Sequence, residues 1–329
     1  MRVLITGAGG FIGSHLVDSQ LEQGNAVRAV DLHLDLLGHQ SAHPCLETIQ
    51  GNITDENVVK KIVDGVEVIY HLASAHLDVR LSDEYYRRVN VSATLSLLDA
   101  ARNAGVKRFV HCSSVGVIGD VEHPPADEST ECHPTNIYER TKLEGEREVL
   151  AFFRRTAFPV VVVRPAWVYG PRCPRTAKLI RTISKGRFLF FGSGENWRHP
   201  VYVSDAVKGL ELGASAESVN GEVFIIASEN AVQVSELVEV MSKEIGVHIP
   251  QLHLPITLGL AGGYALELAF KSIGTQPPFS HRSMDFFWKH NAYSIDKAKR
   301  KLGYQPQTDL QAGMQKTILW NHTSKRGSN

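Results

Sequence analysis

A tyrosine and a lysine stand four residues apart in the segment YERTK at 138–142. Two helical residues at this spacing lie on one face, a turn apart, so Tyr138 and Lys142 could act together. A free tyrosine has a pKa of about 10, and a neighbouring ammonium group favours the phenolate. The pair could therefore move a proton to or from a substrate hydroxyl. Because the Y-x-x-x-K pattern is common in proteins, only its place in the fold can show whether this pair is catalytic.

A hydroxyl donor should complete this pair. HCSSVGVIG at 111–119 offers Ser113 and Ser114 directly after an apolar, β-branched segment. We favour Ser114, with Ser113 as the alternative. Its role would be to hold the substrate oxygen between itself and Tyr138 during proton transfer.

A glycine-rich segment, TGAGGFIG at 6–13, follows the first apolar run and opens a helical pattern. Gly7, Gly10 and Gly13 would allow a tight turn, close approach of a pyrophosphate and close packing of the helix. The helix N-terminus would then face the phosphates. Asp31 ends the second apolar run, where a carboxylate would bind ribose hydroxyls and repel a 2′-phosphate, so the sequence predicts NAD rather than NADP.

Short β-branched runs alternate with segments of helical period along the first half of the chain. This alternation predicts a Rossmann-type doubly wound parallel sheet, with Tyr138 following the fifth strand. We predict an NAD-binding domain at 1–165, with 200–227 returning to it, and a smaller, mostly helical substrate-binding domain at 166–329. The expected strands are 3–6, 27–30, 46–50, 66–72, 108–112 and 159–163, and Thr54 is the expected N-cap of a helix at 54–65.

Composition narrows the class further. The 329 residues hold 35 basic and 35 acidic side chains, so nothing indicates a nucleic-acid partner. The four cysteines form no C-x-x-C pair, which argues against a metal site and favours a reducing compartment. The N-terminus enters an apolar strand without a leader pattern, so we expect a cytoplasmic protein.

The apolar segment 252–270 approaches the length of a membrane span. It also contains Pro255, Gly262, Gly263 and Glu267. We interpret it as a packed helix of the substrate domain rather than a spanning segment. A wall of an apolar substrate site and a contact with a membrane surface are the alternatives.

The motifs together resemble the extended short-chain dehydrogenase/reductase family, which includes nucleotide-sugar epimerases and 3β-hydroxysteroid dehydrogenases. The resemblance covers nearly the whole chain in the family's order. It is carried by TGAGGFIG, Asp31, GNITD at 51–55, HLAS at 71–74, RRVNVSATLSLLDAA at 87–101, GVKRFVHCSS, YERTK, RPAWVYGP at 164–171, HPVYVSDAV at 199–207 and KAKRKLGYQP at 297–306.

The resemblance implies further contacts with NAD. Asn90 would support the active-site backbone and a water, and Lys142 would also donate to the nicotinamide ribose. Asn52 stands where the family usually has Asp, which weakens the adenine contact that it would make. The other implied cofactor residues are Phe11 and Ile12 in the glycine turn, Ile53 near the adenine, Leu72, Ala73 and Ser74 along the cofactor channel, and Pro165 and Val168 at the nicotinamide end.

Two reactions remain open. Arg198 occupies the position of a diphosphate-binding arginine in sugar-nucleotide members, and Arg172 could add charge, which favours a UDP-sugar 4-epimerase acting through a transient keto intermediate. The alternative is a dehydrogenase for a hydrophobic, sterol-like alcohol, indicated by the apolar C-terminal part. Val115 and Gly116 follow the catalytic hydroxyl where dehydratases carry an acid, which argues against dehydration. A non-catalytic NAD-binding scaffold is a minor third possibility.

The resemblance also implies a homodimer. In the family, the helices that carry the asparagine and the Y-x-x-x-K pair often form a four-helix interface. Here these helices would span about 82–104 and 137–155, although an apolar stripe also suits packing within one chain.

Overall fold

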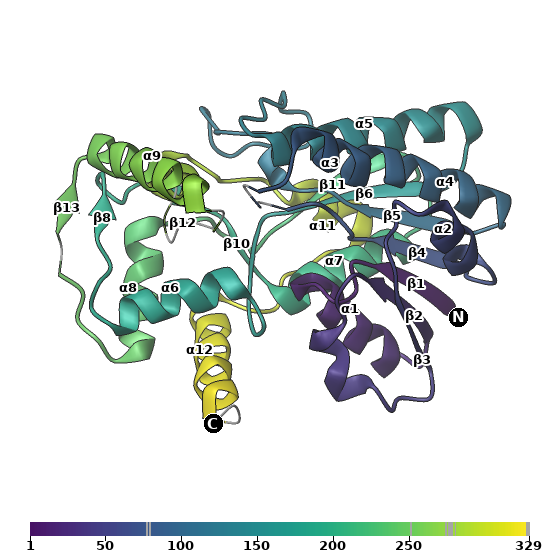
Figure 1. Cartoon of the computed structure of the whole chain (residues 1–329), viewed down its shortest axis with the longest axis horizontal. Coiled ribbons are helices and arrows are strands. Elements are labelled where there is room, and N and C mark those ends of the chain that lie inside the picture. Colours follow the sequence, from purple (N-terminus) through teal and green to yellow (C-terminus); the bar gives the residue numbers. More distant parts are fainter. Residues whose placement is uncertain are drawn as a thin grey trace.

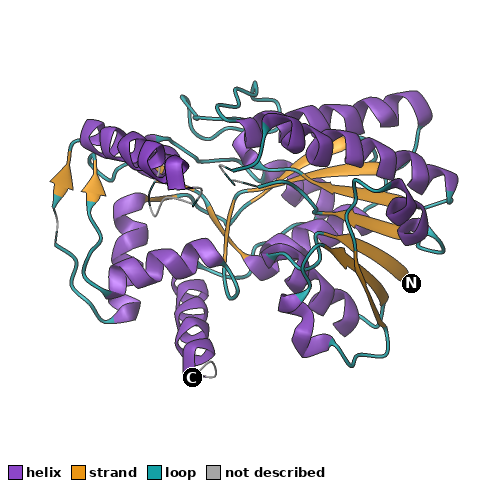
Figure 2. Ribbon diagram, in the orientation of Figure 1, coloured by secondary structure: helices purple, strands orange, loops and turns teal. Residues whose placement is uncertain are grey.

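The computed structural model describes residues 1–76, 78, 80–250, 252–273, 275, 279 and 281–326. Seven parallel strands form one sheet in the order β11-β6-β5-β4-β1-β2-β3 (Figures 1 and 2). The order reverses between β1 and β4, and ligands of such sheets bind at the carboxyl ends of the strands beside that reversal. The strands are β1 (Arg2–Thr6), β2 (Ala26–Asp31), β3 (Leu46–Gln50), β4 (Val68–His71), β5 (Arg108–Cys112), β6 (Val160–Pro165) and β11 (Glu222–Ile226).

Helices cover both faces of this sheet, which is why the central strands are continuous apolar runs rather than alternating ones. Every residue of β4 and β6 is buried. One apolar cluster includes residues of α1 (Phe11–Glu22) and α7 (Val203–Ser215). The opposite cluster includes residues of α2 (Glu56–Val63), α4 (Ala93–Asn103) and α5 (Ile137–Thr156). The predicted Rossmann-type α/β fold is therefore confirmed.

Two local expectations differ from the structure. The N-cap of α2 is Asp55, whose carboxylate accepts the Asn57 amide, and not Thr54, because the helix begins one residue later than expected. The predicted helix at 82–104 is divided into α3 (Asp83–Arg87), a π-helical turn at Arg88–Ser92 and α4. Such π-turns occur frequently at functional sites, and this one contains Asn90.

The second half of the chain contributes to both parts of the molecule. Strand β11 joins the large sheet, and α11 (Asp296–Leu302) packs against it. The predicted division into two domains remains a prediction. The other elements are β7 (Trp167–Tyr169), β8 (Phe190–Phe191), β9 (Trp197–Arg198), β10 (Pro200–Tyr202), β12 (Val232–Gln233), β13 (His253–Leu254), α6 (Pro174–Ser184), α8 (Val234–Ile245), α9 (Ile256–Ile273), α10 (Asp285–Trp288), α12 (Leu310–Arg326) and short 3-10 helices at Asp35–Gln40, Val115–Val117 and His281–Met284.

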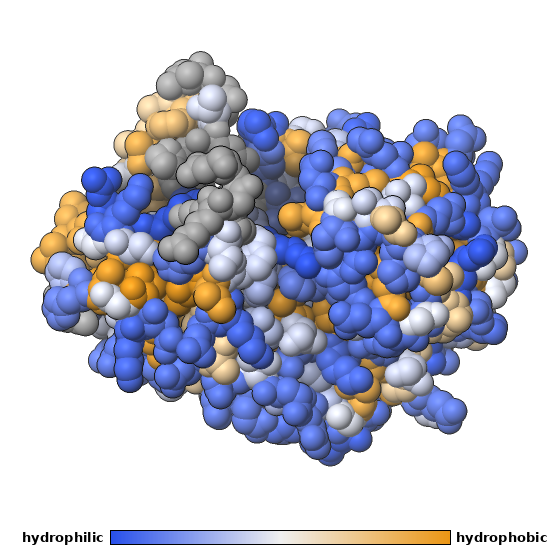
Figure 3. Space-filling view, turned by 90° about the horizontal axis from the view of Figure 1, so that it is seen from below, coloured by the Kyte–Doolittle hydropathy of each residue, from blue (hydrophilic) through white to orange (hydrophobic). Residues whose placement is uncertain are grey.

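The apolar segment forms α9, as expected, but only part of it is packed. Gly259 approaches Phe191 and Met284 closely, whereas Leu258 and Leu268 are 59% and 76% exposed. Figure 3 shows hydrophobic residues beside strongly hydrophilic ones at the end of the molecule that carries β8 and β13. Within the described residues, no helix is long and apolar enough to cross a membrane.

Candidate active site

The glycine turn lies between β1 and α1, at the carboxyl edge of the sheet. Gly7 has a φ of 74°, and a Cβ there would lie 2.6 Å from the amide nitrogen of Ala73. A Cβ on Gly13 would overlap the carbonyl oxygen of Gly7, so the helix packs directly on the turn. Gly10 is the N-cap of α1, and no side chain forms a capping hydrogen bond there. The amide groups of the first turn are therefore left without a side-chain partner. The turn is therefore shaped by backbone contacts that larger residues would prevent.

Asp31 ends β2 beside this turn. Its Oδ2 accepts the amide of Gly9 at 3.0 Å, and its Oδ1 accepts the amide of Leu32 at 2.6 Å. These bonds fix the carboxylate at the edge of the turn, in the position expected for a group that binds ribose hydroxyls. Gly9 was not among the predicted site residues, although a Cβ there would overlap the carbonyl oxygen of His33.

Ser114, Tyr138 and Lys142 come together at the end of β5 and the start of α5. The Tyr138 side chain is half-buried and lies close enough to the Ser114 side chain for that hydroxyl to lower the Tyr138 pKa, and the Ser114 Oγ accepts the amide of Gly116 at 3.1 Å. The Ser113 hydroxyl instead donates to the buried carboxylate of Glu146 at 2.7 Å. The geometry thus favours Ser114 over Ser113 as the hydroxyl that meets Tyr138.

Lys142 is buried one turn after Tyr138, and its Nζ donates to the carbonyl oxygen of Cys112 at 2.6 Å. Burial raises the pKa of Tyr138 to about 12, and the nearby Arg175 opposes this increase. Burial is the largest influence on the Tyr138 pKa, and the Lys142 ammonium is held by the Cys112 carbonyl in this conformation.

Asn90 ties the segment after β4 to α5. Its Oδ1 accepts the amide of Ala75 at 2.7 Å, and its Nδ2 donates to Thr141 Oγ1 at 2.9 Å. A Cβ on Gly145 would overlap the Asn90 carbonyl oxygen, so α5 lies directly against the π-helical turn. This network sets the position of the chain segment that contains Leu72, Ala73 and Ser74 relative to Tyr138.

The remaining predicted cofactor residues lie at or near strand ends. Asn52 follows β3 and its Oδ1 accepts the amide of Thr54, while Ile53 is buried beneath it. Pro165 ends β6, and Val168 lies in β7. Phe11 and Ile12 begin α1. These positions place all of them at the carboxyl side of the sheet.

The two predicted substrate arginines are bound by the chain itself. Arg172 forms an ion pair with Asp18 of α1 at 2.8 Å. The Arg198 guanidinium donates to the carbonyl oxygens of Asp285 and Phe286 and lies over the Phe286 ring, 5.1 Å from its centroid. Burial lowers the pKa of Arg198 to about 10, so the group remains charged at neutral pH. Both guanidinium groups are therefore engaged by partners within the chain.

Two residues beside Tyr138 were missed in the sequence. The His76 ring packs edge-on against Tyr138 with centroids 4.5 Å apart, and Arg175, at the start of α6, contacts His76 Nε2. No pattern identifies either residue, because they come from separate segments that meet only in the fold. Within the described part of the chain, no three His, Cys, Asp or Glu side chains could hold a metal ion together.

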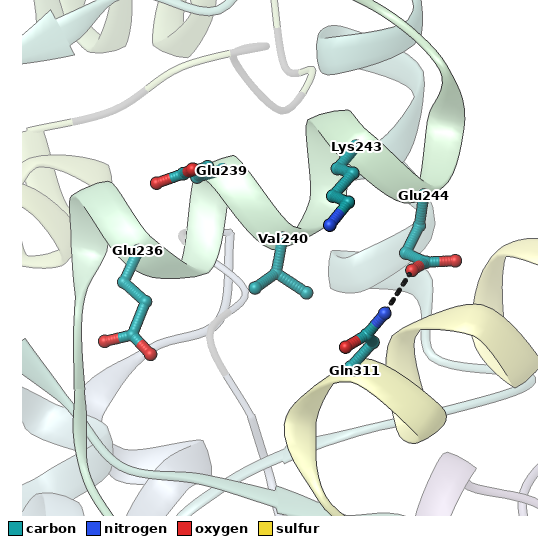
Figure 4. Close-up of a pocket in the computed structure, with 6 residues that line it drawn as sticks. All are labelled: Glu236, Glu239, Val240, Lys243, Glu244 and Gln311. Carbon is teal, nitrogen blue, oxygen red and sulfur yellow. Dashed lines mark hydrogen bonds between the residues drawn. The ribbon is translucent and has the colours of Figure 1, made fainter.

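A surface pocket of about 220 Å³ lies away from these residues, between α8 and α12 (Figure 4). Three glutamates and a lysine line it, and Glu244 accepts a hydrogen bond from Gln311 at 3.2 Å. None of the residues that line it belongs to the glycine turn or to the tyrosine–lysine pair. It is therefore not part of the candidate active site.

The chain is similar to known proteins over nearly its whole length. The chain is 30% identical over 328 residues to a 3β-hydroxysteroid dehydrogenase/Δ5→4-isomerase of Mycobacterium tuberculosis, covering 93% of this chain and 86% of the relative. It is 26% identical over 323 residues to an undecaprenol-linked N-acetylglucosamine 4-epimerase of Escherichia coli O157:H7, covering 97% and 95%. The solved UDP-glucose 4-epimerase of Thermotoga maritima has a TM-score of 0.81 and 26% identity, covering 99% and 100%.

The cofactor expectation can be tested on the turn itself. The absent side chains at Gly7 and Gly13 and the fixed Asp31 carboxylate provide the cradle that a dinucleotide needs, so the residues present fit NAD. A family model described as the NAD dependent epimerase/dehydratase family matches residues 3–227, about two thirds of the chain. The protein is therefore an NAD-dependent enzyme of the extended short-chain dehydrogenase/reductase type and belongs to the NAD-dependent epimerase/dehydratase family.

Proposed function

We propose that the protein oxidises a secondary alcohol with NAD, using Ser114, Tyr138 and Lys142. The observation that carries this proposal is the meeting of the Tyr138 and Ser114 hydroxyls one helical turn from the buried Lys142. The substrate hydroxyl would lie between Ser114 and Tyr138 and pass its proton to the Tyr138 oxygen. NAD, when bound, accepts the hydride from the carbinol carbon.

Lys142 would supply the positive charge that makes this proton transfer feasible near neutral pH. Burial alone leaves Tyr138 with a pKa of about 12, which suits a proton donor but not a base. A shift of the ammonium from the Cys112 carbonyl toward the tyrosine would favour the phenolate. The same pair could then serve oxidation with the phenolate and ketone reduction with the phenol.

We further propose a hydrophobic alcohol of the sterol type as the substrate. The epimerase interpretation depended on Arg198 and Arg172, and both guanidinium groups are bound within the chain. Beside the glycine turn, Phe11 and Trp167 instead pack against an apolar cluster of the substrate-binding part. Trp167 also meets the Phe286 ring, with centroids 6.4 Å apart. The M. tuberculosis relative, named for a hydroxysteroid substrate, supports this choice.

A nucleotide-sugar 4-epimerase is the second candidate. It is supported by the match over the full length of the T. maritima UDP-glucose 4-epimerase and by the E. coli relative, which is named as a 4-epimerase of a lipid-linked sugar. In that reaction the hydride would return to the opposite face of the keto sugar. Arg198 would then have to leave the carbonyl groups of α10 to meet a diphosphate.

One experiment separates the two candidates. The protein is incubated with NAD and either a panel of 3β-hydroxysterols or a panel of UDP-sugars, while NADH absorbance and sugar identity are followed. Steady NADH formation with a sterol supports the dehydrogenase, and inversion of a sugar without net NADH supports the epimerase. A protein that binds NAD but turns over neither panel would contradict both candidates and return the non-catalytic scaffold to consideration.

The cofactor contacts and the assembly are proposed on the same basis. We propose that NAD is held by the glycine turn, Asp31 and the residues at the strand ends, with Lys142 on the nicotinamide ribose. We also propose a homodimer built on α3, α4 and α5, as the family resemblance implies, and a cytoplasmic location. Light scattering of the purified protein tests the dimer, and a monomer mass at micromolar concentration would contradict it.

A further inference from the structure

A buried carboxylate lies one helical turn beyond Lys142 on α5. Glu146 and Arg164 have side chains that are 2% and 5% exposed, and they form two hydrogen bonds with each other, at 2.5 and 3.0 Å. Such a bidentate pair holds both groups in one geometry. The Ser113 hydroxyl is the third member, donating to Glu146 at 2.7 Å. This third bond brings the residue that follows Cys112 into the buried network.

The hydroxyl of Ser113 connects the ion pair to the catalytic lysine. Ser113 follows Cys112, whose carbonyl oxygen accepts the Lys142 ammonium at 2.6 Å. The Ser113 amide donates to the carbonyl oxygen of Val163 at 2.7 Å. The peptide group between Cys112 and Ser113 is therefore held by β6 through its amide, while the Ser113 side chain on the same residue is held by Glu146. Its carbonyl is left directed at Lys142.

Charge gives Glu146 a second connection to Lys142. Burial lowers the pKa of Lys142, and the largest opposing effects come from Cys112 and then Glu146. The Cys112 thiol is neutral at pH 7, because burial raises its pKa to about 11. Three histidines, His71, His76 and His111, also interact electrostatically with Lys142. Burial lowers the pKa of each imidazole below its ordinary value, so these groups are neutral as well. Glu146 is thus the acidic side chain that acts on Lys142, and it is shared with the Arg164 guanidinium.

We propose that Glu146 is a positioning residue for the Tyr138–Lys142 pair: by binding the Ser113 side chain it fixes the segment whose Cys112 carbonyl holds the Lys142 ammonium, and together with Arg164 it sets the local charge around that ammonium. This inference rests on the proposed oxidation chemistry and is common to both candidate reactions. Glu146 has no direct contact with substrate or cofactor in this role. It acts on the charge state and the position of the Lys142 ammonium, which must be charged and correctly placed when Tyr138 exchanges its proton.

The test measures Lys142 directly. Lysine labelled with ¹³C at Cε is titrated by NMR in the full chain with and without NAD, and the Lys142→Met variant assigns the signal. We expect Glu146→Gln to lower the pKa of Lys142 by about one unit, because a nearby opposite charge is removed. Glu148→Gln, on the same helix, is the matched control and should leave the titration unchanged. Ser113→Ala should move it in the same direction by less.

Turnover provides the second readout. In Glu146→Gln the alkaline limb of the kcat profile should move to lower pH by the same amount, while the Kd for NAD stays within about twofold of the unmodified protein. Unchanged Lys142 titration in a folded Glu146→Gln variant would overturn the proposal. If that variant does not fold, unchanged titration in Ser113→Ala has the same consequence. Failure of every alcohol to react would contradict the proposed function but would leave the NMR result decisive for Glu146.

Discussion

The carboxylate of Asp31 accepts the amide of Gly9 at 3.0 Å, which joins the end of β2 to the glycine turn between β1 and α1. The carboxylate is therefore fixed before any cofactor binds. A fixed negative charge at this point favours two ribose hydroxyls and opposes a 2′-phosphate. We therefore expect the Asp31 carboxylate to decide whether NAD or NADP is bound more tightly.

Removal of this carboxylate should relax cofactor choice. We expect the unmodified protein to bind NAD more tightly than NADP, and we expect Asp31→Ala to narrow the ratio by at least about tenfold, the equivalent of one good charged hydrogen bond. Fluorescence titration with NADH and NADPH measures both constants. Asp35→Ala, in the following short helix, serves as the control. Equal binding of the two cofactors by the unmodified protein would contradict the role of Asp31.

Tyr138 and Lys142 should be needed for turnover but not for the fold of the cofactor site. Tyr138→Phe and Lys142→Met are each expected to reduce kcat at least about a hundredfold, the usual scale for losing a positioned proton-transfer group. Tyr138→Phe should retain NAD affinity within a few-fold, because the tyrosine is not part of the glycine turn. Steady-state rates and NADH fluorescence check these outcomes. Near-complete activity in either variant would exclude the mechanism.

The rate of alcohol oxidation should rise with pH. The phenolate is the form that accepts the substrate proton, and burial holds the pKa of Tyr138 at about 12 in the cofactor-free protein. The oxidation rate should therefore increase as pH rises toward the pKa of Tyr138. If the Lys142 ammonium moves closer to the phenol, it lowers that pKa, and the increase occurs at lower pH. The opposite trend is expected for ketone reduction, which needs the phenol. Initial rates in both directions from pH 6 to about 10 test the sign, and parallel profiles would contradict it.

The sequence predicted the parts of the site that depend on local backbone chemistry. The glycine turn could be identified because Gly7 and Gly13 meet backbone atoms, so spacing alone shows the need for absent side chains. The parallel sheet covered by helices on both faces followed from the alternation of β-branched runs with segments of helical period. Position alone could not separate the two serines, because Ser113 and Ser114 both follow the end of β5; their side-chain partners, Glu146 for Ser113 and Tyr138 for Ser114, distinguish them.

Side-chain partners between distant segments could not be predicted. The state of Lys142 depends on the Cys112 carbonyl, 30 residues earlier, and nothing in YERTK indicates that bond. Arg198 matched a family position, yet its guanidinium donates hydrogen bonds to the carbonyl oxygens of Asp285 and Phe286, which lie nearly ninety positions later in the chain. The two residues beside Tyr138, His76 and Arg175, are joined only by the packing of α6 near the segment after β4. Such pairings require the tertiary structure.

Gly9 should tolerate no side chain. A Cβ there would overlap the carbonyl oxygen of His33, which is backbone and cannot move aside cheaply. We expect Gly9→Ala to destabilise the protein by about 1–3 kcal/mol, as overpacking does elsewhere, and to weaken NAD binding by displacing Asp31. Gly38→Ala is the matched control, because no atom lies within 4 Å of its Cβ position. Urea unfolding and NADH titration compare the two, and equal stability of both variants would refute the close contact.

The buried imidazole of His71 should make the fold sensitive to mild acid. Its Nδ1 lies 2.7 Å from Thr6 Oγ1 and its Nε2 lies 2.9 Å from Thr94 Oγ1, so it links β1 to α4. Burial, with repulsion from Lys142, lowers its pKa from 6.5 to about 3. Because the folded-state pKa is the lower one, this contribution to stability is present above pH 6.5 and is lost as pH falls from 6.5 toward 3.

Between pH 7.5 and 5 a single such group accounts for a loss of about 2 kcal/mol in the free energy of unfolding. His71→Gln should lower stability at pH 7.5, since it disturbs two hydrogen bonds, but should reduce the further loss at pH 5 by about that amount. His123→Gln, at an exposed loop position, should leave the slope unchanged. Urea unfolding at the two pH values measures the difference. An unaltered slope in the His71 variant would mean that this imidazole is already protonated, or equally titratable, in the folded protein.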